Sequence, residues 1–374
     1  MIYLHIPFCK QKCSYCNFHF STSFNLKDEM LLAIKKEIGL RKDELESKTI
    51  KSLYLGGGTP SVLSVDEIKS LIDEFQKYFS FDNNIEITLE SNPDDLNKNF
   101  LRELSQTEVN RLSIGTQSFF DEDLRLMNRA HNASEAESSI KCAQDFGLEN
   151  ISIDLIYGSP TSNFEIWKEN LDKTIELQVP HVSSYALTVE PKTALEKWIE
   201  NGKVPAPEET EQNQEFHYMS DFLKKNGFDH YEISNFGKPG FYSKHNSAYW
   251  KSEPYLGIGP SAHSYNGSLE RSWNMANNPL YIKSINQNII PKETEILLQK
   301  DRFNEMMMIG LRTIWGVDLN KVNQNFSSEI IDYFNKESHS KIEDGLLTIE
   351  NNHLKIPEKH WFLADGIASD LFIV

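Results

Sequence analysis

Short apolar runs alternate with longer amphipathic stretches through the first half of the chain. Six runs have the length and residue types of buried strands: Ile2–Ile6, Leu53–Leu55, Ile85–Leu89, Leu112–Ile114, Ile151–Ile156 and Val182–Leu187. Four intervening stretches carry apolar residues at helical spacing: Leu26–Ile38, Val65–Tyr78, Ala133–Phe146 and Phe164–Leu177. This alternation predicts an α/β fold, with helices packed outside a parallel sheet. Six strand–helix units in about 190 residues fit a partial (β/α)6 barrel better than a complete eightfold barrel.

The pattern changes after residue 190, and it predicts three parts: a barrel over 1–190, an extension over 191–300 and a small α+β domain over 301–374. The extension is rich in Pro, Asn, Gly and aromatic residues, and we expect one helix near Glu208–Lys225. The last part predicts two helices, a hairpin and a final helix, in the order Arg302–Ile314, Ser327–Phe334, Leu346–Ile356 and Trp361–Leu371. That order is typical of a winged-helix-like domain.

The net charge and the hydropathy of the chain indicate which kinds of binding partner to expect. The 374 residues carry a formal net charge of −17, which repels a polyanion, so we expect no nucleic-acid partner and a packing role for the winged-helix-like part. No run of about 18 apolar residues occurs, so we expect no transmembrane segment. Met1–His5 lacks the basic and apolar pattern of a signal peptide. These features predict a cytoplasmic protein and leave peripheral contact with a membrane open.

Three of the four cysteines follow the first predicted strand as Cys9-x3-Cys13-x2-Cys16. Thiolates are the usual ligands of iron–sulfur clusters, and three of them leave one iron of a 4Fe–4S cubane without a protein ligand. The amino and carboxylate groups of a small molecule can chelate that open iron. Zinc is the alternative, with His5 or His19 as the fourth ligand. The fourth cysteine, Cys142, lies within a predicted helix and is expected to pack in the core.

This cysteine spacing, with an aromatic residue at Tyr15, resembles the radical S-adenosylmethionine (SAM) superfamily. The resemblance implies a partial barrel, a 4Fe–4S cluster and SAM, which the cluster cleaves to a 5′-deoxyadenosyl radical. The ends of the predicted strands agree, because active sites of α/β barrels lie at the carboxyl ends of their strands. Five such ends are polar or rich in glycine: Gly56–Pro60, Glu90–Pro93, Gly115–Ser118, Asp154–Gly158 and Tyr185–Leu187.

Longer motifs resemble the oxygen-independent coproporphyrinogen III oxidase family over nearly the whole chain. They are Tyr3-x-His5-Ile6-Pro7-Phe8-Cys9, the triple glycine with Thr59-Pro60, Ile114-Gly115-x-Gln117-Ser118-Phe119, and Asp154–Gly158. The resemblance implies SAM contacts from Tyr3, Tyr15, Gly57, Gly58, Thr59, Glu90, Gln117, Arg129 and Asp154. It assigns the SAM amino group to Gly58, the carboxylate to Arg129, and the ribose to Gln117 with Asp154. A guanidinium suits the carboxylate because the two groups form paired hydrogen bonds.

Two branches of that family differ in function. In the oxidase branch a further cysteine stands where this chain has Phe18, and a segment precedes the first strand, which here begins at Ile2. The other branch consists of heme chaperones and has the motif H-N-x-x-Y-W, present here as His245–Trp250. We therefore expect a heme chaperone that passes heme to an acceptor protein, expected to be respiratory, with radical decarboxylation of coproporphyrinogen III as the alternative.

The motif also predicts where heme binds. An imidazole is a common axial ligand of heme iron, and neighbouring aromatic rings can pack on the macrocycle. His245 is the first candidate ligand and His263 the second, while a purely structural role for His245 remains the alternative. Gly and Ser residues around the motif predict that it lies in a loop.

Overall fold

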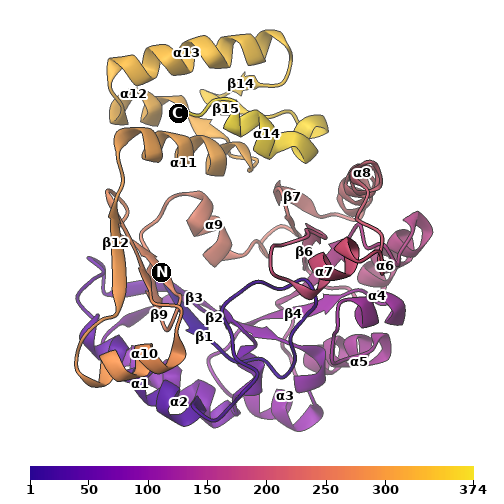
Figure 1. The fold of residues 1–374 in the computed structure, drawn as a ribbon, viewed down its shortest axis with the longest axis vertical. Coiled ribbons are helices and arrows are strands. Elements are labelled where there is room, and N and C mark those ends of the chain that lie inside the picture. The colour runs from indigo at the N-terminus through magenta and orange to yellow at the C-terminus, as the bar shows by residue number, and fades with distance from the viewer.

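The computed structural model describes residues 1–374, and a nine-stranded sheet forms its centre (Figure 1). The strand order is β7-β8-β6-β5-β4-β3-β2-β1-β9. Strands β1 to β6 are parallel neighbours with the bounds Ile2–Ile6, Thr49–Gly57, Ser80–Ser91, Arg111–Gln117, Ile151–Tyr157 and His181–Ala186. Each coincides with one of the six predicted strands. The predicted partial barrel is confirmed, because the sheet ends at β7 and β9 and does not close.

The six helices between these strands are α1 (Lys27–Leu40), α2 (Val65–Gln76), α3 (Lys98–Leu104), α4 (Asp121–Leu126), α5 (Ala133–Asp145) and α6 (Phe164–Glu176). Four of the six, α2, α3, α5 and α6, begin at a capping Ser or Asn. Ser64 forms a capping box with Glu67 at α2, and Asn132 forms one with Glu135 at α5. Each capping box satisfies free N–H groups of a first turn. The four predicted helices are confirmed, and the short α3 and α4 were not predicted.

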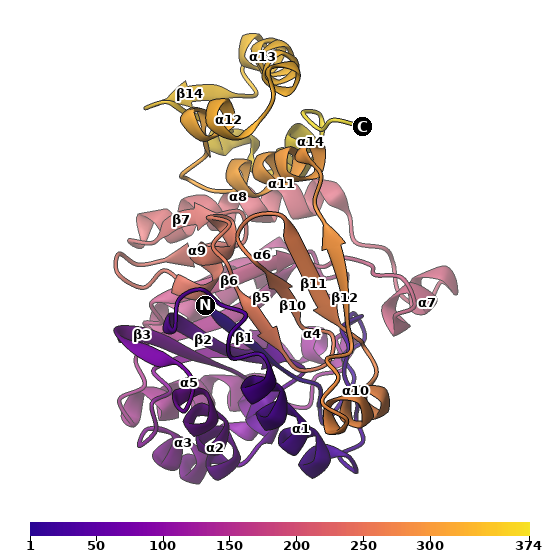
Figure 2. The same cartoon turned by 90° about the vertical axis from the view of Figure 1, so that its left-hand side faces the viewer.

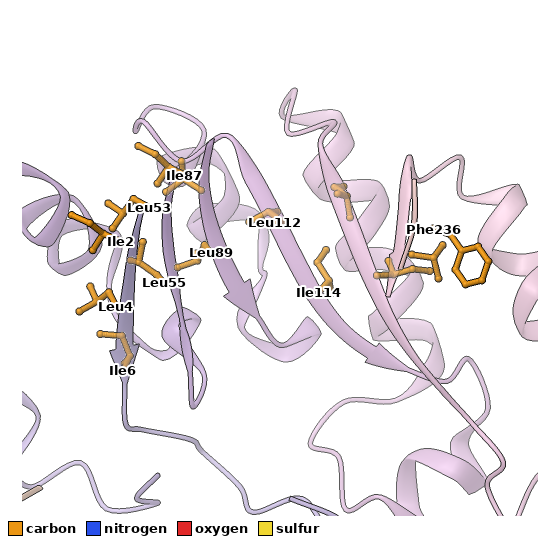
Figure 3. Close-up of a cluster of buried hydrophobic side chains, with 14 of the residues drawn as sticks. Ile2, Leu4, Ile6, Leu53, Leu55, Ile87, Leu89, Leu112, Ile114 and Phe236 are labelled. Carbon is orange, nitrogen blue, oxygen red and sulfur yellow. The ribbon is translucent and has the colours of Figure 1, made fainter. Parts of the chain in front are cut away.

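Residues alternate along β1 between an apolar and a polar face of the sheet. Ile2, Leu4 and Ile6 are fully buried on the side of the helices, as Figure 3 shows. Tyr3 and His5 therefore point to the opposite side, because successive strand side chains face opposite ways. The same alternation recurs in the neighbouring strands, whose apolar residues in Figure 3 include Leu53, Leu55, Ile87, Leu89, Leu112 and Ile114. The interior of the partial barrel is consequently lined by polar side chains.

Residues 191–300 extend the sheet at both edges. This segment contains α7 (Ala194–Glu200), α8 (Glu209–Lys225), β7 (Asp229–Glu232), β8 (Asn235–Gly237), α9 (Lys244–Trp250), β9 (Leu256–Ile258), β10 (His263–Tyr265), β11 (Glu270–Asn274), α10 (Asn278–Asn286) and β12 (Lys292–Ile296). Strand β8 pairs with β6, and β9 pairs in parallel with β1. Strands β10 to β12 form a separate antiparallel sheet, which Figure 2 shows running from α10 toward the C-terminal domain.

The C-terminal domain has the winged-helix-like order predicted from the sequence. It consists of α11 (Gln299–Leu311), β13 (Val317–Asp318), α12 (Leu319–Asn325), α13 (Ser328–Glu343), β14 (Thr348–Glu350), β15 (His353–Lys355) and α14 (Ala364–Ser369). Asn351 and Asn352 both have positive φ in the turn of the predicted hairpin, as a tight two-residue turn requires. No helix of the chain is long and apolar enough to cross a membrane.

Candidate functional site

Two partly buried carboxylates, Glu90 and Asp154, lie inside the barrel at the strand ends. Glu90 Oε1 accepts a hydrogen bond of 2.8 Å from the Tyr54 hydroxyl, and its Oε2 accepts one of 3.0 Å from the Gly57 N–H. Asp154 Oδ1 accepts one of 3.3 Å from the Ser113 hydroxyl. Burial raises the pKa of Glu90 to about 7 and that of Asp154 to about 6. Both groups therefore hold a proton more readily than exposed carboxylates do, and an arriving ligand can change their charge.

The cysteine loop follows β1 and lies against the strand ends. Cys9, Cys13 and Cys16 are all free thiols. The Thr59 hydroxyl lies 3.4 Å from Cys9 Sγ, and Arg129 Nη1 donates a hydrogen bond of 3.2 Å to Cys13 Sγ. No three histidine, cysteine or carboxylate side chains are close enough together to hold a single metal ion.

Arg129 links the cysteine loop to the barrel interior. Its Nη2 donates hydrogen bonds to Asn92 Oδ1 at 2.6 Å and to the Gly115 carbonyl at 2.7 Å. Its buried Nε has no hydrogen-bond partner. Its Nη1 contact with Cys13 Sγ places Arg129 beside the cysteine loop. An unpaired donor at this place fits the carboxylate of a small molecule that chelates the open iron.

The glycine run after β2 lets two backbone segments touch. A Cβ on Gly58 would lie 2.6 Å from the Phe8 carbonyl oxygen, and Gly58 N–H donates to the Ile6 carbonyl at 2.9 Å. Gly57 has a φ of +103°, and a Cβ there would lie 2.3 Å from His5 Nδ1. The sequence suggested that these glycines admit a ligand. In the structure they bring β2 against the start of the cysteine loop, which fixes the loop relative to the strand ends.

The residues predicted to contact SAM fall into neighbouring groups. Tyr3, Gly57 and Glu90 line one cavity of about 850 Å³, and Glu90 and Asp154 line a second of about 70 Å³. Tyr15 and Arg129 lie with Cys13. Thr59 contacts Cys9, Gly58 packs against Phe8, and Gln117 ends β4 with a positive φ of 65°. Such backbone strain in a residue other than glycine is frequent at functional sites.

Several interior residues were missed by the sequence analysis. Tyr54, Arg111 and His181 line the smaller cavity beside Tyr185, which was predicted at a strand end. Tyr54 lies between the buried Leu53 and Leu55, and Arg111 and His181 each precede a buried apolar residue, Leu112 and Val182. Strand periodicity was sufficient to place Tyr54 inside the barrel.

The motif His245–Trp250 forms most of helix α9, so the prediction of a loop is wrong. Ser243, which suggested a loop, is the N-cap and accepts a hydrogen bond from the Asn246 N–H. The Glu86 carboxylate accepts from the N–H groups of Lys244 and His245, each at 3.0 Å. A carboxylate at this end also complements the helix dipole. Capping and charge thus stabilise a helix of only seven residues.

The His245 side chain is enclosed between α9 and the sheet and is only 1% exposed. Its Nδ1 lies 2.9 Å from the Ser52 hydroxyl, and its Nε2 lies 3.2 Å from the Tyr249 hydroxyl. The ring stacks on Tyr54 at 4.9 Å. Burial lowers the pKa of His245 to about 3, so the ring is neutral. In this conformation both ring nitrogens are occupied by protein groups.

The larger cavity joins the strand ends, the cysteine loop and the extension. Its volume of about 850 Å³ is within the range of about 300–1,000 Å³ common for ligand pockets. Aromatic and imidazole rings dominate its lining, which consists of Tyr3, His5, Asn17, Phe18, His19, Gly57, Glu90, Tyr249, Tyr255, Ser261, His263 and Ala276. Among the residues of α9, Tyr249 lines the cavity and His245 does not. The cavity can therefore accept a flat, largely apolar ligand beside the strand ends.

The fold and the cysteine loop define a protein of the radical SAM superfamily. The Radical SAM superfamily model matches residues 3–174, and the HemN C-terminal domain model matches residues 297–363. The structure of coproporphyrinogen III oxidase (HemN) from Escherichia coli has the same fold, with a TM-score of 0.84 and 24% identity over 99% of this chain and 89% of that one.

Curated relatives narrow the class further. Heme chaperone HemW of Lactococcus lactis is 32% identical over 98% of this chain and 95% of its own length. Heme chaperone HemW of Bacillus subtilis is 32% identical over 92% of both chains. The chain belongs to the HemW family.

Proposed function

We propose that this protein is a heme chaperone, which binds heme and passes it to an acceptor protein, expected to be respiratory, in the cytoplasm. The observation that carries the proposal is the cavity of about 850 Å³, where Tyr249 of the family motif faces Gly57 and Glu90 at the strand ends. A heme needs large apolar surfaces and an axial donor, and this cavity offers aromatic rings and histidines. The names of the curated relatives of this protein point to the same activity.

In this proposal Cys9, Cys13 and Cys16 hold a 4Fe–4S cluster. When bound, the cluster and SAM together supply one-electron chemistry at the sulfonium of SAM. The guanidinium of Arg129 donates to Cys13 Sγ, so it stabilises negative charge on that thiolate. The Thr59 hydroxyl lies beside Cys9 Sγ in the same way. These contacts orient the sulfur atoms before any iron arrives.

The SAM site in this proposal follows the strand ends. Arg129, whose buried Nε lacks a partner, pairs with the SAM carboxylate. Gly58 receives the amino group, and Gln117 with Asp154 holds the ribose hydroxyls. Tyr3, Tyr15, Gly57, Thr59 and Glu90 complete the contacts. The Asp154 carboxylate accepts a hydrogen bond from the Ser113 hydroxyl and retains acceptor capacity for a ribose hydroxyl.

The motif His245–Trp250 contributes to the heme site through the wall that α9 presents to the cavity. Iron ligation by His245 remains a prediction, and it requires the side chain to leave the position that it has in the structure. The ring must first leave the Ser52 and Tyr249 hydroxyls, which costs about 1 kcal/mol per hydrogen bond. It must also separate from Tyr54, on which it stacks.

Hemin titration of the protein with a reconstituted cluster tests the proposed function. We expect a saturable Soret absorption, an affinity that depends on SAM, and transfer of the heme to apomyoglobin as a surrogate acceptor. Protein heated beyond unfolding provides the control for nonspecific association of hemin. Absence of saturable binding in the folded, cluster-loaded protein would contradict the proposal.

A further inference from the structure

We propose that His263 ligates the heme iron in the conformation described here, with the macrocycle in the cavity of about 850 Å³. This inference rests on the proposed function and names the ligand within that same site. His263 lies at the start of β10, on the small antiparallel sheet and outside the family motif. Its side chain lines the cavity together with the aromatic residues of the wall.

Availability of the ring nitrogens separates the histidines that line this cavity. His5 Nδ1 lies 3.1 Å from the Tyr3 hydroxyl, and its Nε2 lies 2.9 Å from the His19 carbonyl. His19 Nε2 lies 2.8 Å from Asn278 Oδ1. His263 alone has both ring nitrogens free of protein hydrogen bonds. An iron atom can bind it without displacing any partner.

The comparison with His245 favours His263 further. His245 is 1% exposed and has both ring nitrogens engaged, and α9 is anchored by two N–H groups that donate to Glu86. Turning His245 toward an iron atom therefore requires the helix or the side chain to move. His263 is an exposed residue whose ring already borders the cavity.

The backbone and one aromatic neighbour hold His263 in place. Strand β10 pairs with β11, and the His263 ring stacks on Trp273 with ring centres 5.9 Å apart. A Cβ on Gly257 would lie 2.0 Å from the His263 carbonyl oxygen, so β10 packs tightly against β9. The ligand thus projects from a rigid element, which reduces the ordering cost of binding.

The chemistry of the surrounding wall suits an iron porphyrin. Tyr249, Tyr255 and Phe18 provide ring surfaces, and the Phe18 side chain is 70% exposed. Partial burial and the nearby Arg271 lower the pKa of His263, which favours the neutral ring, and a neutral imidazole has one nitrogen with a lone pair available to iron. Glu90 and Gly57 lie on the same cavity, so heme at His263 faces the proposed SAM site.

The test compares hemin binding by cluster-loaded wild-type protein, His263→Ala, His245→Ala and the control His339→Ala. His339 is a surface residue whose side chain is 73% exposed. We expect His263→Ala to shift the Soret band and weaken affinity by about tenfold or more. We expect the control His339→Ala to retain the wild-type spectrum, whereas a change of spectrum in His245→Ala alone would contradict the assignment to His263. Free imidazole should restore the spectrum of His263→Ala, because it can occupy the space of the missing ring.

Opposite results overturn the inference in distinct ways. A folded His263→Ala protein with wild-type spectrum and affinity rules out His263, and loss of binding in His245→Ala alone assigns the iron to the motif. If His263→Ala fails to fold, His263→Met provides the test, because a thioether ligand must change the heme spectrum. An unchanged spectrum in His263→Met would contradict ligation by His263. Failure of wild-type protein to bind hemin would instead contradict the proposed function itself.

Discussion

Replacing Glu90 with glutamine should make the protein lose less stability as the pH rises. The Glu90 carboxyl is partly buried, and the loss of solvation raises its pKa from 4.5 to about 7 in the folded state. A raised pKa means that the folded state binds a proton more tightly than the unfolded state does. The stability linked to that proton is complete below pH 4.5 and is lost as the pH rises through about 7.

The magnitude follows from the two pKa values. A difference of about 2.5 units corresponds to about 3 kcal/mol, since one unit is worth about 1.4 kcal/mol. Between about pH 5 and pH 8, roughly 2.5 kcal/mol of this should be lost. The Glu90→Gln side chain does not titrate and can keep both contacts, because its oxygen can accept from the Gly57 N–H while its amide group donates to the Tyr54 oxygen.

Urea unfolding of the cluster-free protein without SAM, at pH 5 and pH 8, measures the effect. Between these pH values, we expect the free energy of unfolding of the wild-type protein to fall by about 2.5 kcal/mol more than that of Glu90→Gln. Glu215 and Glu232, whose pKa values are also raised by burial, titrate in both proteins and cancel in the difference. The exposed Glu103 of α3 provides the control, as Glu103→Gln should behave like wild type. Equal pH dependence in wild type and Glu90→Gln would refute the reasoning.

Three further predictions concern the metal site, the cofactor site and the reaction. Cys13→Ala should abolish a stable 4Fe–4S cluster and Cys142→Ala should retain it, as iron and sulfide analysis after anaerobic reconstitution will show; equal iron in both contradicts the assignment. Arg129→Ala and Asp154→Ala should each weaken SAM binding by about tenfold or more while keeping the cluster, because each variant loses a charge-assisted hydrogen bond. Calorimetric titration with SAM measures this affinity, and wild-type affinity in both variants would place the pocket elsewhere. Since Phe18 stands where the oxidase has cysteine, reduced protein with SAM should form no protoporphyrinogen from coproporphyrinogen III, and formation above the no-enzyme control would overturn this prediction.

Much of the barrel could be predicted because its signals are local. Ile2, Leu4 and Ile6 alternate with Tyr3 and His5, and this pattern alone indicates a strand with one face in the core. The helices α1, α2, α5 and α6 were predicted from apolar residues at helical spacing, which is also a local signal. The spacing of Cys9, Cys13 and Cys16 is visible in the sequence itself, because all three cysteines lie on one short loop.

The rest depends on contacts between distant residues. Ser52 and His245 lie 193 positions apart, so no local pattern indicates that their side chains meet. Helix α9 and strand β9 are too short to show a period, and β9 has only three residues. The prediction of His245 as the first candidate ligand came from the motif His245–Trp250, whereas the burial and hydrogen bonding of His245 became visible only in the folded chain.

The pairing of β9 with β1 bears on the order in which the protein folds during synthesis. Leu256–Ile258 covers the edge of Ile2–Leu4 that faces away from β2. A ribosome makes β1 first, yet that edge stays unpaired until residue 258 has emerged. Unpaired edges are sites of misassembly, so the nascent chain has a long period of exposure to chaperones and to other chains. The strand that leads into the cysteine loop and the strand that precedes His263 are therefore completed together, after two-thirds of the polypeptide has been made.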